Sequence, residues 1–394
     1  MRFFGRLQNI LDYAIGGLRR KVLKNCTVFL VFSVVVFLFA SFQLINRALT
    51  ELAGDILDGA PDITVQQLAA GRQVSISLAG REAVAAIFGV RRVDERIWGY
   101  YFDPGTAANY TVVGLPGLLP GIAPKSWAES EVAQLFSPGR PGRVVISPGV
   151  REQLGLDGRR FFSLFRPDLS LASFEVVADF SPETDLVTAD LILMRLADAR
   201  DLFAVPDDLV TDLLVTVGNP LEIDTVAEKI RELLPGVRVI TRQQMRKTYE
   251  VVFGWRSGLG SICLLTALVT FAILAWDKAS GLSAEEVREV GVLKVLGWQT
   301  TDIIFLRFCE SAVVACTAFA CGYLLAWLHL LLFDGGFFRP IFLGWSVLRP
   351  SFPLAPPLVL ADLLVVLAIS VLPYLCATAV PAWRAAVVRA DSVL

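Results

Sequence analysis

The chain has 394 residues, of which 55% are hydrophobic and only 19% are charged, and its formal net charge is −2 at pH 7. A chain of this length with so apolar a composition is not expected to be an ordinary soluble enzyme. The composition indicates a membrane protein, and no nucleic-acid partner is expected.

Long apolar stretches are predicted to cross the bilayer as helices. Four stretches contain no Asp, Glu, Lys or Arg between their ends: Cys26–Ile45, Leu259–Trp276, Ser311–Phe333 and Leu363–Trp383. A helix rises about 1.5 Å per residue, so about 20 residues cross an apolar core about 30 Å thick. With their flanks, the predicted spans are residues 26–45, 251–276, 303–333 and 358–383. The first is interpreted as an uncleaved anchor, because signal peptides have a shorter apolar region of about 7–15 residues.

Basic residues before the first span predict its orientation. They are Arg2, Arg6, Arg19, Arg20, Lys21 and Lys24. Cytoplasmic flanks are enriched in Lys and Arg, so the N-terminus is predicted to be cytoplasmic, and four crossings return the tail, residues 384–394, to the same side. Residues 1–25 have apolar positions at helical spacing, which predicts an amphipathic helix at the inner membrane surface; a frayed basic leader is the alternative. The predicted location is a bacterial inner (plasma) membrane.

Residues 46–250 are predicted to form one extracytoplasmic domain between the first two spans. They contain 21 basic and 28 acidic residues, a net charge of −7. Strand, helix and strand patterns follow one another at Leu213–Gly218, Pro220–Pro235 and Val237–Thr241, which predicts a β-α-β unit in a mixed α/β (α+β) domain. Further strands are predicted at 73–80 and 173–180, a short helix at 197–203, loops at 103–110 and 114–124, and a separate lobe around 115–142.

Recognisable catalytic motifs are missing from the sequence. It contains no GxxxxGK[ST] phosphate loop, no GxGxxG after a strand, no HExxH, and one histidine in all. The six cysteines lie in or beside the apolar stretches without zinc-site spacing, so neither a metal site nor a disulfide framework is expected. A pair of catalytic carboxylates is not excluded by sequence. We expect a chain that is not itself an enzyme and holds no cofactor.

The segment between the second and third spans, residues 277–302, contains the candidate site. In "EVREVGVLKVLGWQTTDII" (286–304) the charged residues come first and apolar residues follow. At about 100° per residue, the later apolar positions spread almost all the way round a helix. Such a helix needs cover from its own bundle and from a partner, whose backbone could approach closely at Gly291 and Gly297. The alternative is a connecting loop whose apolar residues dip into the lipid interface.

This segment resembles the coupling segment of MacB/FtsX-type (type VII) ABC transporter permeases. The matching positions are Arg288, Glu289, Val290, Gly291, Leu293, Lys294, Leu296 and Gly297, with Val290 in place of the commoner Ile. Glu310 and Gly322 fall where the family often has Glu and Gly. The tail matches the family ending at Pro381, Ala382, Ala385 and Ala386. The order of parts agrees over the whole chain, from the inner-surface helix to the short tail.

The resemblance implies several partners. The coupling segment would dock on a cytoplasmic ABC ATPase that binds ATP, in two copies, and a second permease chain would complete a homo- or heterodimer. The implied activity is mechanotransmission, in which ATP hydrolysis moves the outer domain to export or extract a lipid, lipoprotein, peptide or hydrophobic compound, with or without a periplasmic adaptor. The alternative is an FtsX-like transmitter that activates an external partner such as a cell-wall hydrolase. A membrane scaffold that works without an ATPase is a third class.

Ionisable residues in the third span need an explanation of their own. Arg307 and Glu310 are spaced i,i+3, so a mutual ion pair would offset part of the roughly 2.5–3.5 kcal/mol that a charge costs at mid-membrane. The alternative places both near the inner headgroups, where they fix the helix end. His329 is expected to be a neutral packing residue. Residues 334–357 are predicted to rest at the outer interface.

Overall fold

The computed structural model describes residues 10, 12–17, 20, 22–117, 134–137, 140–181, 184–253, 258–280, 284–343, 354 and 359–387. Its backbone divides into two compact units. The first comprises residues 1–49, 253–342 and 354–394, and the second comprises residues 50–252 and 343–353. We call them the helical unit and the α/β unit, and describe each by itself.

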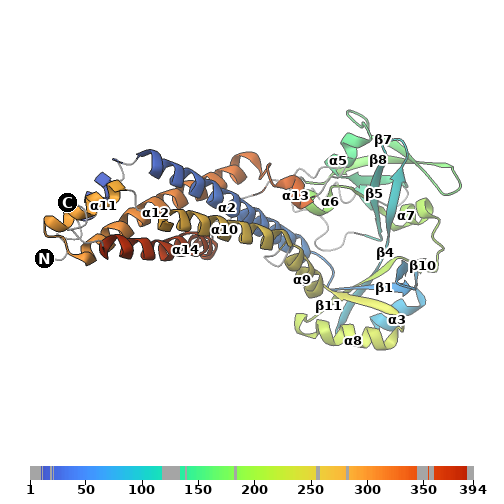
Figure 1. Cartoon of the computed structure of the whole chain (residues 1–394). Helices are drawn as coiled ribbons and strands as arrows, with labels where there is room; N and C mark the ends of the chain where they lie inside the picture. The colour runs from blue at the N-terminus through green and yellow to red at the C-terminus, as the bar shows by residue number, and fades with distance from the viewer. Residues whose placement is uncertain are drawn as a thin grey trace. The chain divides into compact units, whose positions relative to one another are not determined.

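The helical unit is built from long apolar helices (Figure 1). They are α2 (Val22–Asp58), α10 (Gly258–Ser280), α12 (Thr300–Phe333) and α14 (Leu360–Val387). Within the described residues, α2, α12 and α14 contain apolar stretches long enough to cross a membrane, at Asn25–Gly54, Thr300–Phe333 and Leu360–Arg384. The corresponding apolar stretch of α10 is shorter, Ile262–Leu274. Three of the four predicted spans therefore have helices of sufficient length.

Aromatic and small residues hold these helices together. The ring of Phe32 in α2 lies 4.8 Å from that of Phe271 in α10 and 5.3 Å from that of Tyr374 in α14. The Ser33 hydroxyl donates to the Ala318 carbonyl of α12 at 3.2 Å. A Cβ built on Gly322 would lie only 2.5 Å from the Ser33 carbonyl oxygen. Glycine is therefore what lets α12 approach α2 so closely.

His329 packs near the C-terminal end of α12, in agreement with its expected packing role. Its Nε2 accepts the Phe337 amide at 3.3 Å, so this nitrogen carries no proton and the ring is neutral. The imidazole is 4% exposed and lies 5.6 Å from the Phe37 ring and 5.3 Å from the Phe337 ring. The helix α13 (Arg339–Leu343) follows, and most of the predicted loop beyond it lies outside the described residues.

The α/β unit contains one long mixed sheet and a small two-stranded sheet, β10–β3. The order in the long sheet is β12-β1-β11-β4-β5-β9-β6-β8-β7, with β2 added to β1. The strands are β1 (Ile63–Ala69), β2 (Arg72–Val74), β3 (Ile76–Ser77), β4 (Val90–Asp103), β5 (Ala108–Leu115), β6 (Arg143–Ile146), β7 (Phe161–Phe165), β8 (Leu171–Asp179), β9 (Leu191–Arg195), β10 (Leu209–Val210), β11 (Asp212–Val217) and β12 (Val237–Thr241).

Short helices accompany these strands. They are α3 (Ala79–Ala85), α5 (Pro148–Gln153), α6 (Asp185–Thr188), α7 (Leu196–Phe203), the 3-10 turn η2 (Pro220–Glu222), α8 (Ile223–Leu233) and α9 (Arg242–Phe253). The helix α7 packs so closely on β5 that a Cβ at Gly114 would collide with the Cβ of Ala199. Gly114 thus sets the distance between this helix and the sheet.

The predicted β-α-β unit is confirmed as β11, α8 and β12. Both strands pair antiparallel with β1, which lies between them, so β11 and β12 run parallel to each other. The strand predicted at 173–180 is β8 and the helix predicted at 197–203 is α7. The strand predicted at 73–80 is wrong in part, because the chain forms two short strands there, β2 and β3, and its last two residues begin α3. Of the loop predicted at 103–110, residues 104–107 connect β4 to β5 and residues 108–110 already belong to β5. Most of the lobe predicted around 115–142 lies outside the described residues.

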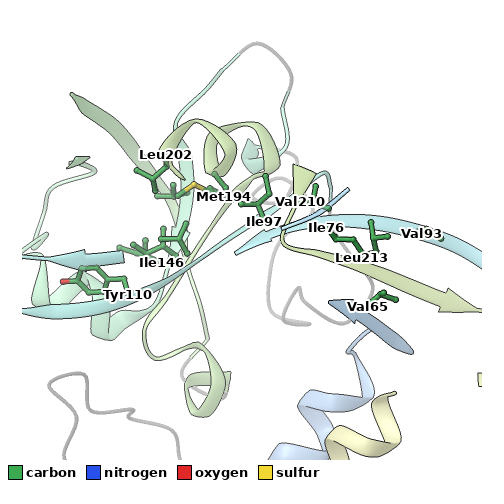
Figure 2. Packing of buried hydrophobic residues seen from close by; sticks show 14 of the residues in the cluster. Val65, Ile76, Val93, Ile97, Tyr110, Ile146, Met194, Leu202, Val210 and Leu213 are labelled. Atoms are coloured by element: carbon green, nitrogen blue, oxygen red, sulfur yellow. The ribbon is translucent and has the colours of Figure 1, made fainter. Parts of the chain in front are cut away.

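The long strand β4 joins the two halves of this sheet. Its first half pairs with β11 and its second half, from Ile97, pairs with β5. One buried core runs along it; Figure 2 shows Val65, Val93 and Leu213 near one end and Tyr110, Ile146 and Met194 near the other. Because both halves share this strand, they form one continuous sheet.

Candidate functional site

The predicted coupling segment folds as a short helix that ends in a tight turn. The helix α11 spans Ala284–Val295. At its end the Trp298 amide donates to the Leu293 carbonyl at 3.1 Å and the Gly297 amide donates to the Lys294 carbonyl at 3.0 Å. This pair of bonds is a Schellman motif, whose left-handed position favours glycine. Gly297 has φ +92°, with open space around it, so its backbone conformation explains the glycine without a close partner.

The next helix begins with its own cap, which fixes the other side of the turn. Gln299 is the N-cap of α12, and its side chain and that of Asp302 form a reciprocal capping box. The Gln299 backbone amide donates to the Asp302 carboxylate at 3.0 Å. Both ends of the turn at 296–299 are thus held by hydrogen bonds, and the segment is an ordered corner between two helices.

One side of α11 is covered by the chain itself. Val290 and Leu293 are 1% and 4% exposed. Val290 clusters with Ile303 of α12. Leu293 clusters with residues of α12 and of the N-terminal segment: Leu306, Cys309, Ile10 and Ala14. This packing explains why a helix with apolar residues on several sides forms here.

The described residues leave the other side of α11 uncovered. Val292, Val295 and Leu296 are 55%, 67% and 71% exposed. They are spaced i, i+3 and i+4, so they share one face. Arg288 beside them is exposed as well. We call Val292, Val295 and Leu296 the apolar face of α11.

The structure separates the eight predicted coupling residues by environment. Arg288, Leu296 and Gly297 are exposed, Glu289 and Lys294 are half-buried, and Val290, Gly291 and Leu293 are buried. Because Gly291 is buried, it is not an approach point for a partner on the exposed side. Val292 and Val295 were missed by the motif comparison; their shared face with Leu296 on a helical wheel was the signal that could have found them.

A network of charges links α11 to α12 and to the N-terminal segment. Glu289 Oε1 is 3.1 Å from Arg20 Nη2, and Glu289 Oε2 is 3.5 Å from Arg307 Nη2. Arg307 Nη1 is also 2.9 Å from Glu310 Oε2, which confirms the predicted i,i+3 ion pair. The side chains of Arg307, Glu310 and Glu289 are 15%, 14% and 20% exposed. Partial burial strengthens the attraction within each pair but also costs desolvation, so the clearest consequence is that removing one partner leaves an uncompensated charge.

The N-terminal segment contributes to this site. Its described residues, Ile10, 12–17 and Arg20, are helical. The Tyr13 ring lies 5.5 Å from that of Trp298, and the Arg20 guanidinium carbon lies 5.1 Å from the Tyr13 ring centroid. Residues 1–25 were predicted to form an amphipathic helix at the membrane surface; two of its apolar residues, Ile10 and Ala14, are buried against α11 and α12. Such a contact joins residues about 280 positions apart, and sequence periodicity does not show it.

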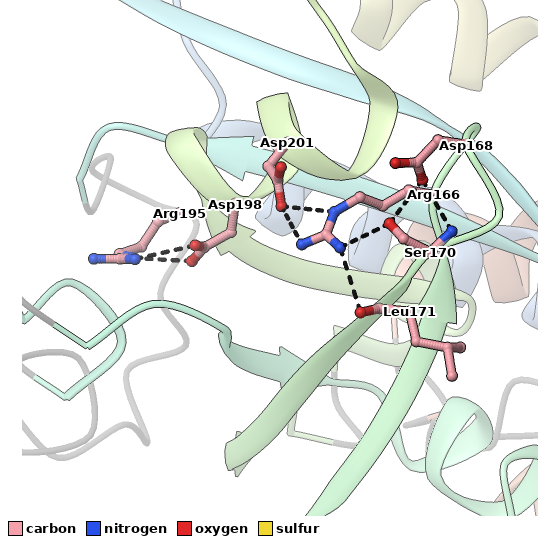
Figure 3. A network of polar contacts seen from close by, with 7 residues as sticks. All are labelled: Arg166, Asp168, Ser170, Leu171, Arg195, Asp198 and Asp201. Carbon is pink, nitrogen blue, oxygen red and sulfur yellow. Dashed lines mark hydrogen bonds and ion pairs between the residues drawn. The ribbon is translucent and has the colours of Figure 1, made fainter.

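Charged residues of the α/β unit form ion pairs and hydrogen bonds that hold its local structure (Figure 3). Arg195 binds both carboxylate oxygens of Asp198 at 3.0 Å, and Arg166 binds Asp201 at 2.6 Å. Asp168 accepts from the Ser170 hydroxyl at 2.7 Å and from its amide at 2.9 Å, and these bonds lower the pKa of the Asp168 carboxyl. Each of these carboxylates is engaged in holding a turn or a helix end.

The long apolar helices indicate a membrane protein. Its α/β unit follows the first of these helices as a separate domain, and the half-covered helix α11 exposes apolar side chains at a helical corner. Residues 257–387 match the model of the family described as FtsX-like permease C-terminal. This part of the chain is thus similar to the C-terminal region of FtsX-like permeases, in agreement with the resemblance of its motifs.

Two solved structures are similar to part of the chain. One is the periplasmic region of MacB from Actinobacillus actinomycetemcomitans, with 9% identity and a TM-score of 0.32, covering 49% of this chain and 94% of that one. The other is the extracellular domain of the noncanonic ABC-type transporter YknZ from Gram-positive bacteria, with 9% identity and a TM-score of 0.31, covering 45% of this chain and 99% of that one. None of the curated proteins compared with the sequence matches it.

Proposed function

We propose that this chain is the permease subunit of an ATP-driven ABC exporter, and that α11 docks on a separate cytoplasmic ATPase. The observation that carries the proposal is the apolar face of α11, with Val292, Val295 and Leu296 all more than half exposed at an ordered corner. The family match supports the same assignment, because permeases of this family work with an ATPase. In this scheme the ATPase, and not this chain, would bind and hydrolyse ATP.

Docking would bury side chains that the helical unit leaves in solvent. Burying an exposed Val or Leu is worth about 1.5–3 kcal/mol for a whole side chain. The face is also prearranged, since the Schellman turn and the capping box hold α11 and α12 at a fixed corner. A prearranged apolar face loses little conformational entropy on binding and can transmit a displacement to the helices behind it.

The rest of the proposal follows the permease assignment. Four helices, with α10 as the second, would cross the bacterial inner membrane, with both termini in the cytoplasm and the α/β unit outside. Two permease chains, alike or different, would pair with two ATPase copies, with or without a periplasmic adaptor. Motion started at α11 would reach the α/β unit and drive export or extraction of a lipid, lipoprotein, peptide or hydrophobic compound.

The proposal is tested by placing a charge on the apolar face. Val295→Asp and Leu296→Asp should each abolish co-purification of the ATPase with the full-length chain, because a carboxylate cannot be buried in an apolar contact without a partner. The matched control is Leu221→Asp, which puts the same charge on a leucine that is 90% exposed in the α/β unit. The control should retain the ATPase. Normal recovery of the ATPase with both α11 variants would refute docking through this face.

A further inference from the structure

Glu289 divides its carboxylate between two different parts of the chain. Oε1 pairs with Arg20 of the N-terminal segment and Oε2 with Arg307 of α12. Its side chain is 20% exposed, and both of its carboxylate oxygens are paired within the chain. An ATPase contact to this glutamate would have to break these pairs. Its position suits a connection between α11 and the two elements behind it.

The N-terminal segment is attached to α11 by more than this ion pair. Ile10 and Ala14 pack with Leu293 in one buried cluster, and the Tyr13 ring lies against that of Trp298. Arg20 closes the attachment, because it pairs with Glu289 and lies over the Tyr13 ring. Apolar packing, a ring contact and an ion pair thus all attach the N-terminal segment to α11 and the turn that follows it.

The same segment leads directly into α2. Arg20 precedes the first residue of that helix, Val22, by two positions, and α2 continues without interruption to Asp58. The helical unit ends at Leu49 within this helix, and the α/β unit begins at Thr50. The chain itself therefore carries any displacement of Arg20 into the helix that enters the α/β unit.

We propose, resting on the proposed function, that the Arg20–Glu289 pair couples α11 to α2 and makes α2 follow the ATPase-driven movement of α11. Arg20 and Glu289 are positioning residues in this scheme. The second route from α11, through Arg307 and the Val290–Ile303 contact, moves α12. Displacement of α11 thus divides between two helices, and Arg20 controls only the share that goes to α2.

The test compares amide hydrogen exchange of the reconstituted full-length chain and its ATPase, with and without ATP and vanadate. Exchange is followed in residues 22–30, at the start of α2, and in residues 300–310, at the start of α12. The perturbing variant is Arg20→Gln, which removes the charge but keeps a long polar side chain. Arg20→Lys keeps the charge. Arg384→Gln is the matched control, because Arg384 is exposed near the end of α14 and has no ion pair to a described residue.

In the wild-type complex, we expect nucleotide to change the exchange of both regions. Arg20→Gln should keep ATPase binding and the change in residues 300–310 but clearly reduce the change in residues 22–30, whereas Arg20→Lys and Arg384→Gln should keep both. The inference is overturned if Arg20→Gln retains the wild-type change at 22–30, or if the wild type shows none there. It is also overturned if Arg20→Gln releases the ATPase, since Arg20 would then belong to the docking surface. Failure of the wild-type chain to bind the ATPase would instead reject the proposed function, and this inference with it.

Discussion

Replacing Gly322 by alanine should drive α2 and α12 apart. A Cβ at this position would meet the Ser33 carbonyl oxygen at 2.5 Å, the Val36 Cβ at 2.9 Å and the Val36 Cγ1 at 3.0 Å. Backbone and β-branched atoms cannot rotate out of the way, so the helices themselves must shift. In doing so they would stretch the 3.2 Å hydrogen bond from the Ser33 hydroxyl to the Ala318 carbonyl.

The expected loss of stability combines two terms. An extra methyl group in a packed interior costs about 1–3 kcal/mol. A hydrogen bond between membrane helices is worth about 0.6 kcal/mol on average. Alanine gains about 0.5–1 kcal/mol over glycine within a helix, which offsets part of the loss. The net destabilisation should be about 1–3 kcal/mol.

Gly54 provides a matched control of opposite sign. Like Gly322 it lies within a long helix, here α2, but a Cβ at Gly54 would have nothing within 4 Å. Gly54→Ala should therefore stabilise the protein slightly, through helix propensity alone. Thermal unfolding of the full-length protein in detergent or nanodiscs measures both variants. A melting temperature for Gly322→Ala equal to or above that of wild type would refute the close approach of α2 and α12.

Two further changes test the docking turn and the α/β unit. Gly297→Ala forces a side chain onto a residue with φ +92°, which costs about 1–2 kcal/mol. The free turn of the variant should relax to avoid this strain, and docking must restore it, so ATPase binding should weaken roughly tenfold. Gly297→Asn should restore part of the affinity in a titration of the ATPase. An equal affinity for all three proteins would contradict the turn. Asp212→Ala removes a fully buried carboxylate that accepts hydrogen bonds from Arg96 Nε at 2.9 Å and from Gln73 Nε2 at 2.7 Å. Because Arg96 is then left unpaired, denaturant unfolding should show the α/β unit destabilised by about 3–5 kcal/mol. A loss below about 1 kcal/mol would show that Arg96 finds another partner or solvent.

The local patterns of the chain were sufficient for several elements. Apolar length alone predicted α2, α12 and α14, because an apolar core imposes a minimum helix length whatever the neighbouring helices are. Alternation and helical spacing predicted β11, α8 and β12, because these elements each bury one face. The Arg307–Glu310 pair was predicted too, since i,i+3 spacing brings two side chains together within one helix.

Patterns were less informative where a neighbour decided the outcome. The strand predicted at 73–80 is divided into β2 and β3, and its last two residues begin α3. The strand β4 pairs with two different strands along its length, which no short window of sequence shows. In the candidate site, Gly291 was expected to face a partner and is buried instead. A short stretch of sequence predicts on which face of a helix a side chain lies. Whether that face is buried depends on the neighbouring helices.

By itself, the sequence determined that this is a membrane protein with a large domain after its first span, and it located the segment 286–304 that carries the candidate site. These features depend on composition and on contacts within a few residues. Only the tertiary structure decided which side of α11 is covered, and that Tyr13 and Arg20 reach Trp298 and Glu289. The physical reason is that burial and ion pairing are set by distances in space, and those distances are fixed when helices far apart in the chain pack together.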